Sequence, residues 1–146
     1  MRYAFTIIEL VFVIVVLGIL SAIAIPKFNS VSTEAQITKG RSDISAIRSA
    51  IVSERQSRLI KGDTSWITSL SNNKNYYFDG NDSNKSTLLM YGIKEENANG
   101  HWHSWDDKKH TYKFKIEDKD ILFTYNNKDG TFSCDTNIQR CSDLTD

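Results

Sequence analysis

Residues 5–25 read FTIIELVFVIVVLGILSAIAI, an almost wholly apolar run that is interrupted near its start by one acidic side chain, Glu9. A helix rises about 1.5 Å per residue, so this run is long enough to cross the ~30 Å hydrocarbon core of a membrane. A carboxylate inside such a helix costs about 2.5 kcal/mol near the centre and less toward an end. An intramembrane charge therefore points to a function, and its nearest candidate partner is the free amine of a chain that begins at Phe5.

A short leader, Met1 to Ala4, precedes Phe5 and Glu9, and the apolar run ends just before Pro26. This arrangement over residues 1–28 resembles the class III signal of type IV pilins and of the pseudopilins of type II secretion systems. The resemblance implies that a prepilin peptidase cuts between Ala4 and Phe5 and methylates the new Phe5 amine. The family usually has Gly before the scissile bond, so we expect processing after Ala4, but at a lower rate.

Two other interpretations of the apolar run compete with this resemblance. The small residues at 22–24 imitate the cleavage site of an ordinary secretory signal peptide. Such a peptide has an apolar region of about 7–15 residues, and it should not contain an acidic residue such as Glu9. A plain single-pass anchor leaves the combination of Phe5, Glu9 and Pro26 unexplained.

The composition limits the possible roles of the remaining chain. The 146-residue chain has 18 basic and 18 acidic side chains, so its net charge gives no argument for binding nucleic acid. The positive-inside rule barely decides the orientation, because Arg2 precedes the apolar run and Lys27 lies just after it. The resemblance implies a helix in the bacterial inner membrane and a periplasmic head. We expect four segments: a leader at 1–4, an assembly helix at 5–25, an amphipathic helix half at 26–62 and a head at 63–146.

The two cysteines, Cys134 and Cys141, lie near the C-terminus. Their spacing is compatible with a disulfide in an oxidising compartment, and a reduced, unrelated pair in the cytosol is the alternative. Type IV pilins often close a C-terminal loop in this way, so the resemblance favours the bridge. It would add about 2–3 kcal/mol on a loop-entropy estimate.

A second helical pattern begins after Pro26, where we expect a bend because proline lacks an amide hydrogen and crowds the preceding turn. We expect this half to run from about Ser30 to Lys61 and to be capped by Gly62. One face is apolar and includes Ile37, Gly40, Ile44, Ile47 and Ile51. The opposite face includes Lys39, Arg41, Ser42, Arg48, Ser49 and Arg55.

The second half of the chain predicts a small antiparallel meander. We expect a short helix or turn at 64–70, a polar loop at 72–85 and strands at 87–93, 111–117, 121–125 and 131–134, with turns at 117–120 and 126–130. The apolar face of the meander would consist of Tyr112, Phe114, Ile116, Leu122 or Phe123, and Phe132. Packed on the isoleucine stripe, it gives an α+β fold, with a long N-terminal helix on a small sheet.

Candidate sites in the head are few. His101 and His103 with nearby carboxylates could bind a metal, but no third ligand is fixed by spacing, and we expect an aromatic loop that packs on the sheet. Trp102 and Trp105 could instead anchor a partner protein. The resemblance also suggests calcium as a ligand, because major pseudopilins bind calcium in a C-terminal acidic loop. Asp129, Asp135 and Asp143 do not form an EF-hand pattern, and we assign no metal or cofactor.

A weak basic patch is the remaining candidate for binding DNA. It consists of Lys108, Lys109, Lys113 and Lys115, and it is offset by Asp106, Asp107, Glu117 and Asp118. We therefore do not expect a nucleic-acid partner.

The sequence contains no order of residues typical of a catalytic triad, a P-loop or a dinucleotide site, so we do not expect an enzyme. The resemblance implies a filament subunit in which Glu9 neutralises the Phe5 amine of a neighbour. Its partners would be copies of itself, related subunits, the peptidase, membrane lipid, and an inner-membrane platform with its ATPase. The small head favours a type II secretion pseudopilin over a pilus pilin or a competence pseudopilin. A binding or enzymatic domain merely anchored by the helix is the alternative from another class.

Overall fold

The computed structural model describes residues 5–80, 88–106 and 108–145, apart from the side chains of Pro26, Asn29 and Gln139. The elements are α1 (Ile7–Ile60), β1 (Tyr76–Tyr77), β2 (Ile93–Lys94), β3 (Trp102–Asp106), β4 (Thr111–Ile116), β5 (Lys119–Asn126), β6 (Thr131–Cys134) and α2 (Gln139–Thr145). The chain divides into two compact units, residues 1–34 and 35–146, and we call the second the head. The expected α+β layout, one long N-terminal helix and a small antiparallel sheet, is confirmed.

The membrane half and the amphipathic half of the expected long helix form one continuous element, as predicted, because α1 continues through position 26. The side chain of Pro26 lies outside the described residues, so the expected bend there stays a prediction. The end of α1 was predicted correctly. Gly62 has a φ of +80°, and the Asp63 amide donates to the Arg58 carbonyl at 2.9 Å while the Gly62 amide donates to the Leu59 carbonyl at 3.0 Å. This double hydrogen bond is a Schellman cap, which satisfies carbonyls that the helix itself leaves unpaired.

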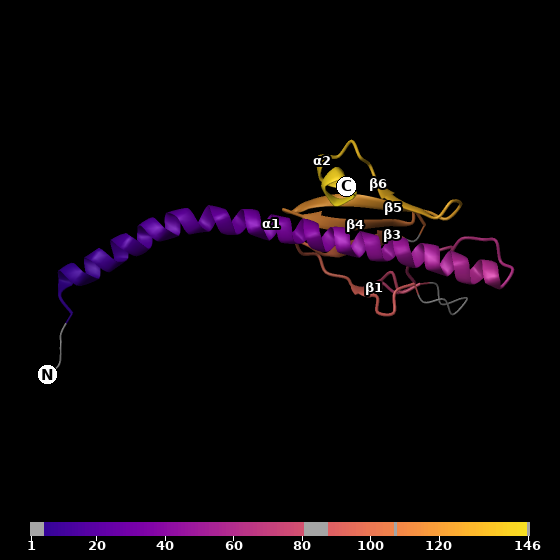
Figure 1. The fold of residues 1–146 in the computed structure, drawn as a ribbon, viewed down its shortest axis with the longest axis horizontal. Coiled ribbons are helices and arrows are strands. Elements are labelled where there is room, and N and C mark those ends of the chain that lie inside the picture. The colour runs from indigo at the N-terminus through magenta and orange to yellow at the C-terminus, as the bar shows by residue number, and fades with distance from the viewer. Residues whose placement is uncertain (1–4, 81–87, 107, 146) are drawn as a thin grey trace. The chain divides into compact units, whose positions relative to one another are not determined.

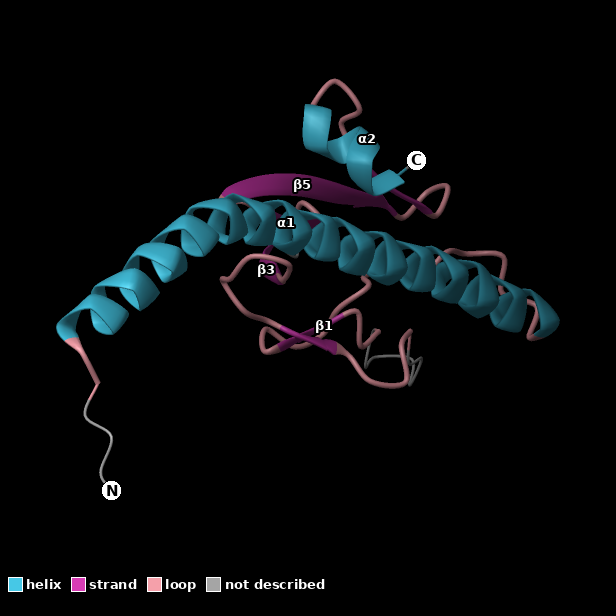
Figure 2. Ribbon diagram, turned by 60° about the vertical axis from the view of Figure 1, so that its left-hand side comes forward, coloured by secondary structure: helices cyan, strands magenta, loops and turns pink. Residues whose placement is uncertain are grey.

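The head contains a four-stranded antiparallel sheet in the order β3-β4-β5-β6, which lies against the C-terminal part of α1 (Figure 1). β4 and β6 match the predicted strands, whereas β5 begins at Lys119. The turn before β5 is therefore shorter than expected. Glu117 and Asp118 both adopt positive φ, 48° and 60°, as in the tight turns whose twist suits a hairpin. Figure 2 shows α2 on one side of α1 and β1 on the other.

The core forms where the isoleucine stripe of α1 meets the inner face of the sheet. Ile44, Ile47 and Ile51 are at most 2% exposed, as are the inward residues of β4. Of the two candidates in β5, Phe123 is buried and Leu122 is 44% exposed. Gly40 allows a close approach, because a Cβ there would lie 2.6 Å from Leu144 Cδ2 and 2.8 Å from Phe114 Cε1. The predicted helix-on-sheet packing is confirmed.

The connector between α1 and β3 differs from the prediction. Residues 64–70 contain no helix, and β2 takes only the end of the strand expected at 87–93, whose first residue lies outside the described part. The segment expected to be a polar loop carries Tyr77 and Phe78, which are 3% and 0% exposed. Phe78 has a φ of 60°, and its amide donates to the buried Ser71 Oγ at 2.8 Å. This segment therefore supplies part of the core, although its polar composition predicted an exposed loop.

The face of α1 opposite the isoleucines is only partly free. Ser42 and Ser49 are exposed as expected. Three arginines reach round to main-chain carbonyls of the head: Arg41 Nε to Asp143 at 2.6 Å, Arg48 Nε to Phe132 at 3.1 Å, and Arg55 Nη1 to Ser65 at 2.8 Å. The arginines flank the buried isoleucine stripe. Their side chains are long enough to reach the head, so the polar face of α1 is not fully exposed as the division into two faces predicted.

Candidate functional site

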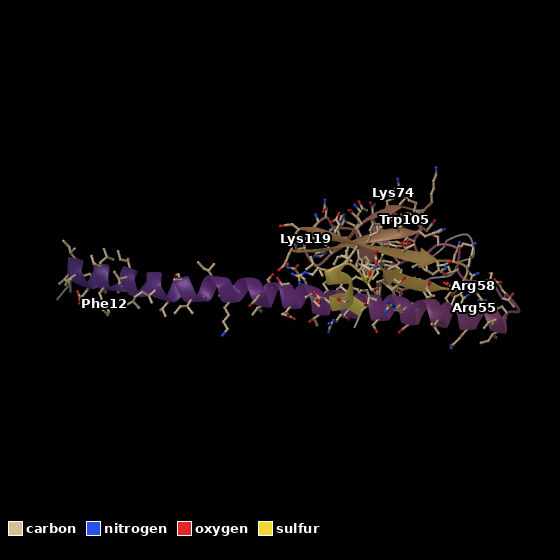
Figure 3. The ribbon with its side chains drawn as sticks, turned by 90° about the horizontal axis from the view of Figure 1, so that it is seen from above. Phe12, Arg55, Arg58, Lys74, Trp105 and Lys119 are labelled. Atoms are coloured by element: carbon tan, nitrogen blue, oxygen red, sulfur yellow. A yellow bond between two sulfur atoms is a disulfide. The ribbon has the colours of Figure 1, made fainter. Side chains whose placement is uncertain are left out.

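The strongest candidate site lies at the start of α1, where every described side chain from position 5 to position 25 is exposed. Phe5 is 84% exposed, and Phe12, labelled in Figure 3, is 69% exposed. The run is apolar and long enough to cross a membrane, with none of its most apolar window buried by the rest of the protein. Such a surface is stable only against lipid or another apolar surface. Ala4 lies outside the described residues, so cleavage between Ala4 and Phe5 stays a prediction.

The geometry around Glu9 reveals a role that the sequence interpretation missed. The Thr6 amide and hydroxyl donate to Glu9 Oε2 at 2.8 and 2.7 Å, and the Glu9 amide donates to Thr6 Oγ1 at 3.3 Å. This reciprocal pattern is a capping box, which satisfies donors at the first turn of a helix. The spacing Thr6-x-x-Glu9 could have revealed it. Glu9 thus has a partner within its own chain, and its pairing with a neighbouring amine remains a prediction.

The two cysteines form the expected bridge. Cys134 at the end of β6 and Cys141 in α2 are joined, with their Cα atoms 5.9 Å apart. Cys141 is fully buried, and its amide donates to the Ile138 carbonyl at 2.8 Å. The bridge therefore fixes α2 to the edge of the sheet. Leu144 of α2 packs against α1 at Gly40, where the absence of a side chain leaves room for it.

The aromatic and histidine cluster is mainly part of the core. Trp102 in β3 is fully buried, and its indole Nε1 donates to Asp43 Oδ2 of α1 at 3.1 Å. Burial raises the pKa of Asp43, and the hydrogen bond from Trp102 opposes that shift. Trp105 is partly buried beside the core and stacks on Tyr112. Trp102 is thus inaccessible to a partner protein. Residues 102–106 form strand β3 of the sheet itself, so the expectation of an aromatic loop packed on the sheet was wrong, because pairing with β4 draws this segment into the sheet.

The two histidines are held by separate neighbours. His103 is 5% exposed and its Nε2 lies 2.8 Å from Asp120 Oδ1, while Lys113 Nζ lies 3.2 Å from the other oxygen of Asp120. Burial opposes ionisation of Asp120, but the hydrogen bonds from Lys113 and His103 outweigh it and lower its pKa. His101 Nδ1 is 3.5 Å from Lys39 Nζ. Within the described ranges no group of three metal-ligating side chains is found.

The C-terminal carboxylates form local turns. Asp129 Oδ1 accepts from the Thr131 hydroxyl and amide at 2.7 and 2.9 Å, and these hydrogen bonds, the one from the hydroxyl first, lower the pKa of Asp129. Asp135 closes a turn, because the Asn137 amide donates a hydrogen bond to Asp135 Oδ1 at 3.0 Å. Asp143 pairs with Arg140 at 3.2 Å. The three carboxylates thus have separate partners.

The lysines of the weak basic patch have different hydrogen-bond and ion-pair partners. Lys113 pairs with Asp120, and Lys115 Nζ donates to the Asn97 side-chain oxygen. Asp106 accepts from the amides of Lys108 and Lys109 at 3.1 and 3.3 Å. Asp107 lies outside the described residues. Lys113 and Lys115 are therefore held by separate polar neighbours, whereas Lys108 and Lys109 bind Asp106 through their main-chain amides.

Sequence comparison finds a short stretch of similarity to known proteins. Two curated proteins of Pseudomonas aeruginosa, both described as "Fimbrial protein", are 44% identical to this chain over 46 residues. The match covers 32% of this chain and 30% of each relative. The chain therefore spans less than a third of the length of the curated relatives it matches. No family model and no solved structure matches the chain.

Proposed function

We propose that this chain is a structural subunit of a type IV pilus-like filament, with the first part of α1 as its assembly element. The observation that carries the proposal is the complete exposure of the apolar residues 5–25 in a chain whose head buries its own core. None of the most apolar window of this helix is buried among the described residues, whereas membrane lipid would cover it before assembly and neighbouring helices after it. The similarity to fimbrial proteins supports the same role.

The expected route starts in the bacterial inner membrane, with the head in the periplasm. A prepilin peptidase would cut before Phe5 and methylate the new amine, and an inner-membrane platform with an ATPase would drive assembly. Intact mass of the membrane-extracted protein tests this route. It should show that residues 1–4 are missing and that one methyl group has been added. A mature chain that begins near Ile25 would identify an ordinary secretory signal peptide instead.

Glu9 is the residue on which the assembly step depends. In a neighbour's apolar surroundings its carboxylate would be stabilised by the Phe5 amine, because an unpaired charge there is costly. Glu9→Leu should therefore insert into the membrane at least as well as the wild type but fail to enter filaments. Quantifying the chain in the membrane and in sheared filaments separates the two steps.

The capping box requires a matched control, Glu9→Gln. Glutamine can still accept from the Thr6 amide, as capping boxes with Gln do, but it has no charge. If the charge is needed, Glu9→Gln should be depleted from filaments nearly as strongly as Glu9→Leu. If Glu9→Gln assembles normally, helix capping explains the acidic residue and the pairing of Glu9 with Phe5 is wrong.

Two filament systems are candidates for this subunit. The compact head, whose strands are joined by short turns at 117–118 and 127–130, favours a type II secretion pseudopilin over an adhesive fibre. The description of the relatives as fimbrial proteins favours a pilus pilin. Deleting the gene and measuring protein export and surface fibres in the same strain distinguishes them. Lost export with normal fibres identifies the pseudopilin, and the reverse result identifies the pilin.

A further inference from the structure

A groove of about 290 Å³ lies between α1 and α2 in the head. Its polar lining consists of Arg41, Arg48, Ser45, Ser49 and Thr145. None of its lining side chains is a carboxylate, so it combines two positive charges with three hydroxyl groups. We call this surface the basic groove. Guanidinium and hydroxyl groups together are suited to binding carboxylate oxygens.

The two arginines of the basic groove are held in place without being neutralised. Arg41 and Arg48 are seven residues apart, so they lie on the same side of α1 two turns apart. Each uses its Nε to donate to a main-chain carbonyl, which fixes the guanidinium. Neither forms an ion pair with a carboxylate in the part of the chain that the structure describes, and Asp143 pairs with Arg140 instead. A preorganised pair of this kind loses little entropy when it binds an anion.

Two adjacent carboxylates, Glu95 and Glu96, lie at the other edge of the head, and we call them the acidic pair. The Glu96 amide donates to the carbonyl of Trp102 in β3 at 3.1 Å, which places the pair beside β3. Glu96 lies 3.7 Å from His101, which is charged only when protonated. No ion pair of Glu95 occurs between described residues. Lys39 Nζ lies 3.5 Å from the same His101 nitrogen, Nδ1, so a permanent positive charge stands near Glu96. Glu95 is therefore the carboxylate of the acidic pair that is left without an ion pair in the described part of the chain.

The basic groove and the acidic pair are on opposite flanks of the head. Arg48 reaches β6, whereas Asp43 on the other flank of α1 binds Trp102 of β3. β3 and β6 are the two outer strands of the sheet, with β4 and β5 between them. The two complementary charged surfaces of one copy therefore face away from each other.

We infer that the basic groove of one copy binds the acidic pair of the next copy, joining heads head-to-tail along a filament. The inference rests on the proposed filament function and names the contact between heads. Two different but complementary surfaces form a heterologous interface, and such an interface grows into an open helical filament when its rotation does not close a ring. Apolar helices alone fix no such register between heads, whereas charge pairs do.

Charge reversal in the full-length chain tests the contact. Arg41→Glu with Arg48→Glu places four like charges together and should lower the amount of chain in sheared filaments about tenfold. Glu95→Arg with Glu96→Arg should do the same. All four changes in one chain restore opposite charges at the contact and should recover most of the lost incorporation. A second measurement uses Ser49→Cys with Glu96→Cys in one chain, which should give a ladder of covalently linked copies when filaments are oxidised, whereas neither single variant should.

Arg55→Glu is the matched control for a change that merely loosens the head. Arg55 lies on the same flank and also donates to a main-chain carbonyl, but it does not line the basic groove. It should leave incorporation within about twofold of the wild type. Normal incorporation of both reversed pairs, failure of the fourfold change to restore filaments, or an equal loss in Arg55→Glu would each overturn the contact while leaving the filament function standing. A wild-type chain that enters no filament would overturn both.

Discussion

The two ends of α1 contain similar apolar residues but have opposite surroundings. Every side chain from position 5 to position 25 is exposed, whereas Ile44, Ile47 and Ile51 are at most 2% exposed. The second group lies on one face because polar residues separate the isoleucines, and the sheet of the head covers that face. The first group is apolar all round, so no single face of one small domain could cover it. The difference shows which part of the helix is covered by its own chain and which part leaves its apolar surface exposed.

The largest expected effect separates two isoleucines of this one helix. Ile47→Ala should lower the free energy of unfolding of the head by about 2–5 kcal/mol, because it removes buried methyl groups and leaves a cavity. Ile14→Ala, at a 58% exposed position, should leave that free energy unchanged. Urea titration of the full chain in detergent measures both, since all three tryptophans, which lie at 66, 102 and 105, report only on the head.

Ser49→Ala is the control on the exposed side of α1 and should change stability by no more than about 0.5 kcal/mol. Equal, small effects of Ile47→Ala and Ser49→Ala would mean that α1 does not pack on the sheet. The division of the helix into a self-covered and an uncovered part would then be wrong.

Removing the disulfide should have the next largest effect. Replacing Cys134 and Cys141 by serine should lower the stability of the head by about 2–3 kcal/mol, because the unfolded chain regains the freedom that the bridge removes. Non-reducing peptide mapping of protein from the cell envelope should find the two cysteines joined. Free thiols at both positions would remove the support that the bridge gives to an oxidising compartment.

Two glycines provide a smaller comparison within α1. Gly40→Ala should destabilise the head by about 1–3 kcal/mol, because its Cβ would overlap Leu144 and Phe114. Gly18→Ala meets nothing within 4 Å and should leave the head unchanged while favouring the helix by up to about 1 kcal/mol. Thermal unfolding followed by tryptophan fluorescence checks the first change, and far-ultraviolet circular dichroism checks the second. A Gly40→Ala variant as stable as the wild type would show that α2 does not pack closely on α1.

The smallest expected effect is a pH dependence at Asp43. Burial raises the pKa of Asp43 in the folded head, so the folded state binds its proton more tightly than the unfolded state does. The stability that this group contributes is therefore absent at neutral pH, and it develops as the pH falls through the folded pKa and on toward the lower unfolded pKa. Asp43→Asn keeps an acceptor for Trp102 and should be more favourable relative to the wild type at pH 7 than at pH 4. Parallel stability profiles of the two proteins would show that Asp43 is not buried as described.

Asp129 should contribute with the opposite sign, because the Thr131 hydroxyl and amide lower its pKa. Its contribution is present at neutral pH and is lost as the pH falls through its folded pKa. Thr131→Val removes the hydroxyl and should reduce that loss. If the stability of the Thr131→Val variant depends on pH in the same way as that of the wild type, this assignment is contradicted.

The sequence by itself determined the features that depend on local periodicity. Runs and alternations specify which residues share a face, so the apolar run, the isoleucine stripe, the strands at 111–117 and 131–134, and the cap at Gly62 were all predicted. The disulfide was expected as well, because the cysteine spacing is compatible with a bridge and the resemblance to pilins favours one. The capping box of Thr6 and Glu9 is equally local, and its spacing was overlooked rather than hidden.

Tertiary structure alone decided which polar segments enter the core and which charges remain uncompensated. Tyr77 and Phe78 lie in a stretch rich in Asn, Asp and Gly, and only their packing on aromatic side chains of the sheet such as Tyr112 explains their burial. Arg41 and Arg48 line a groove because α2, about a hundred residues later, is fixed beside them by the disulfide. A periodic pattern specifies the direction of a side chain from its own element, but contacts between distant elements specify what the side chain meets there.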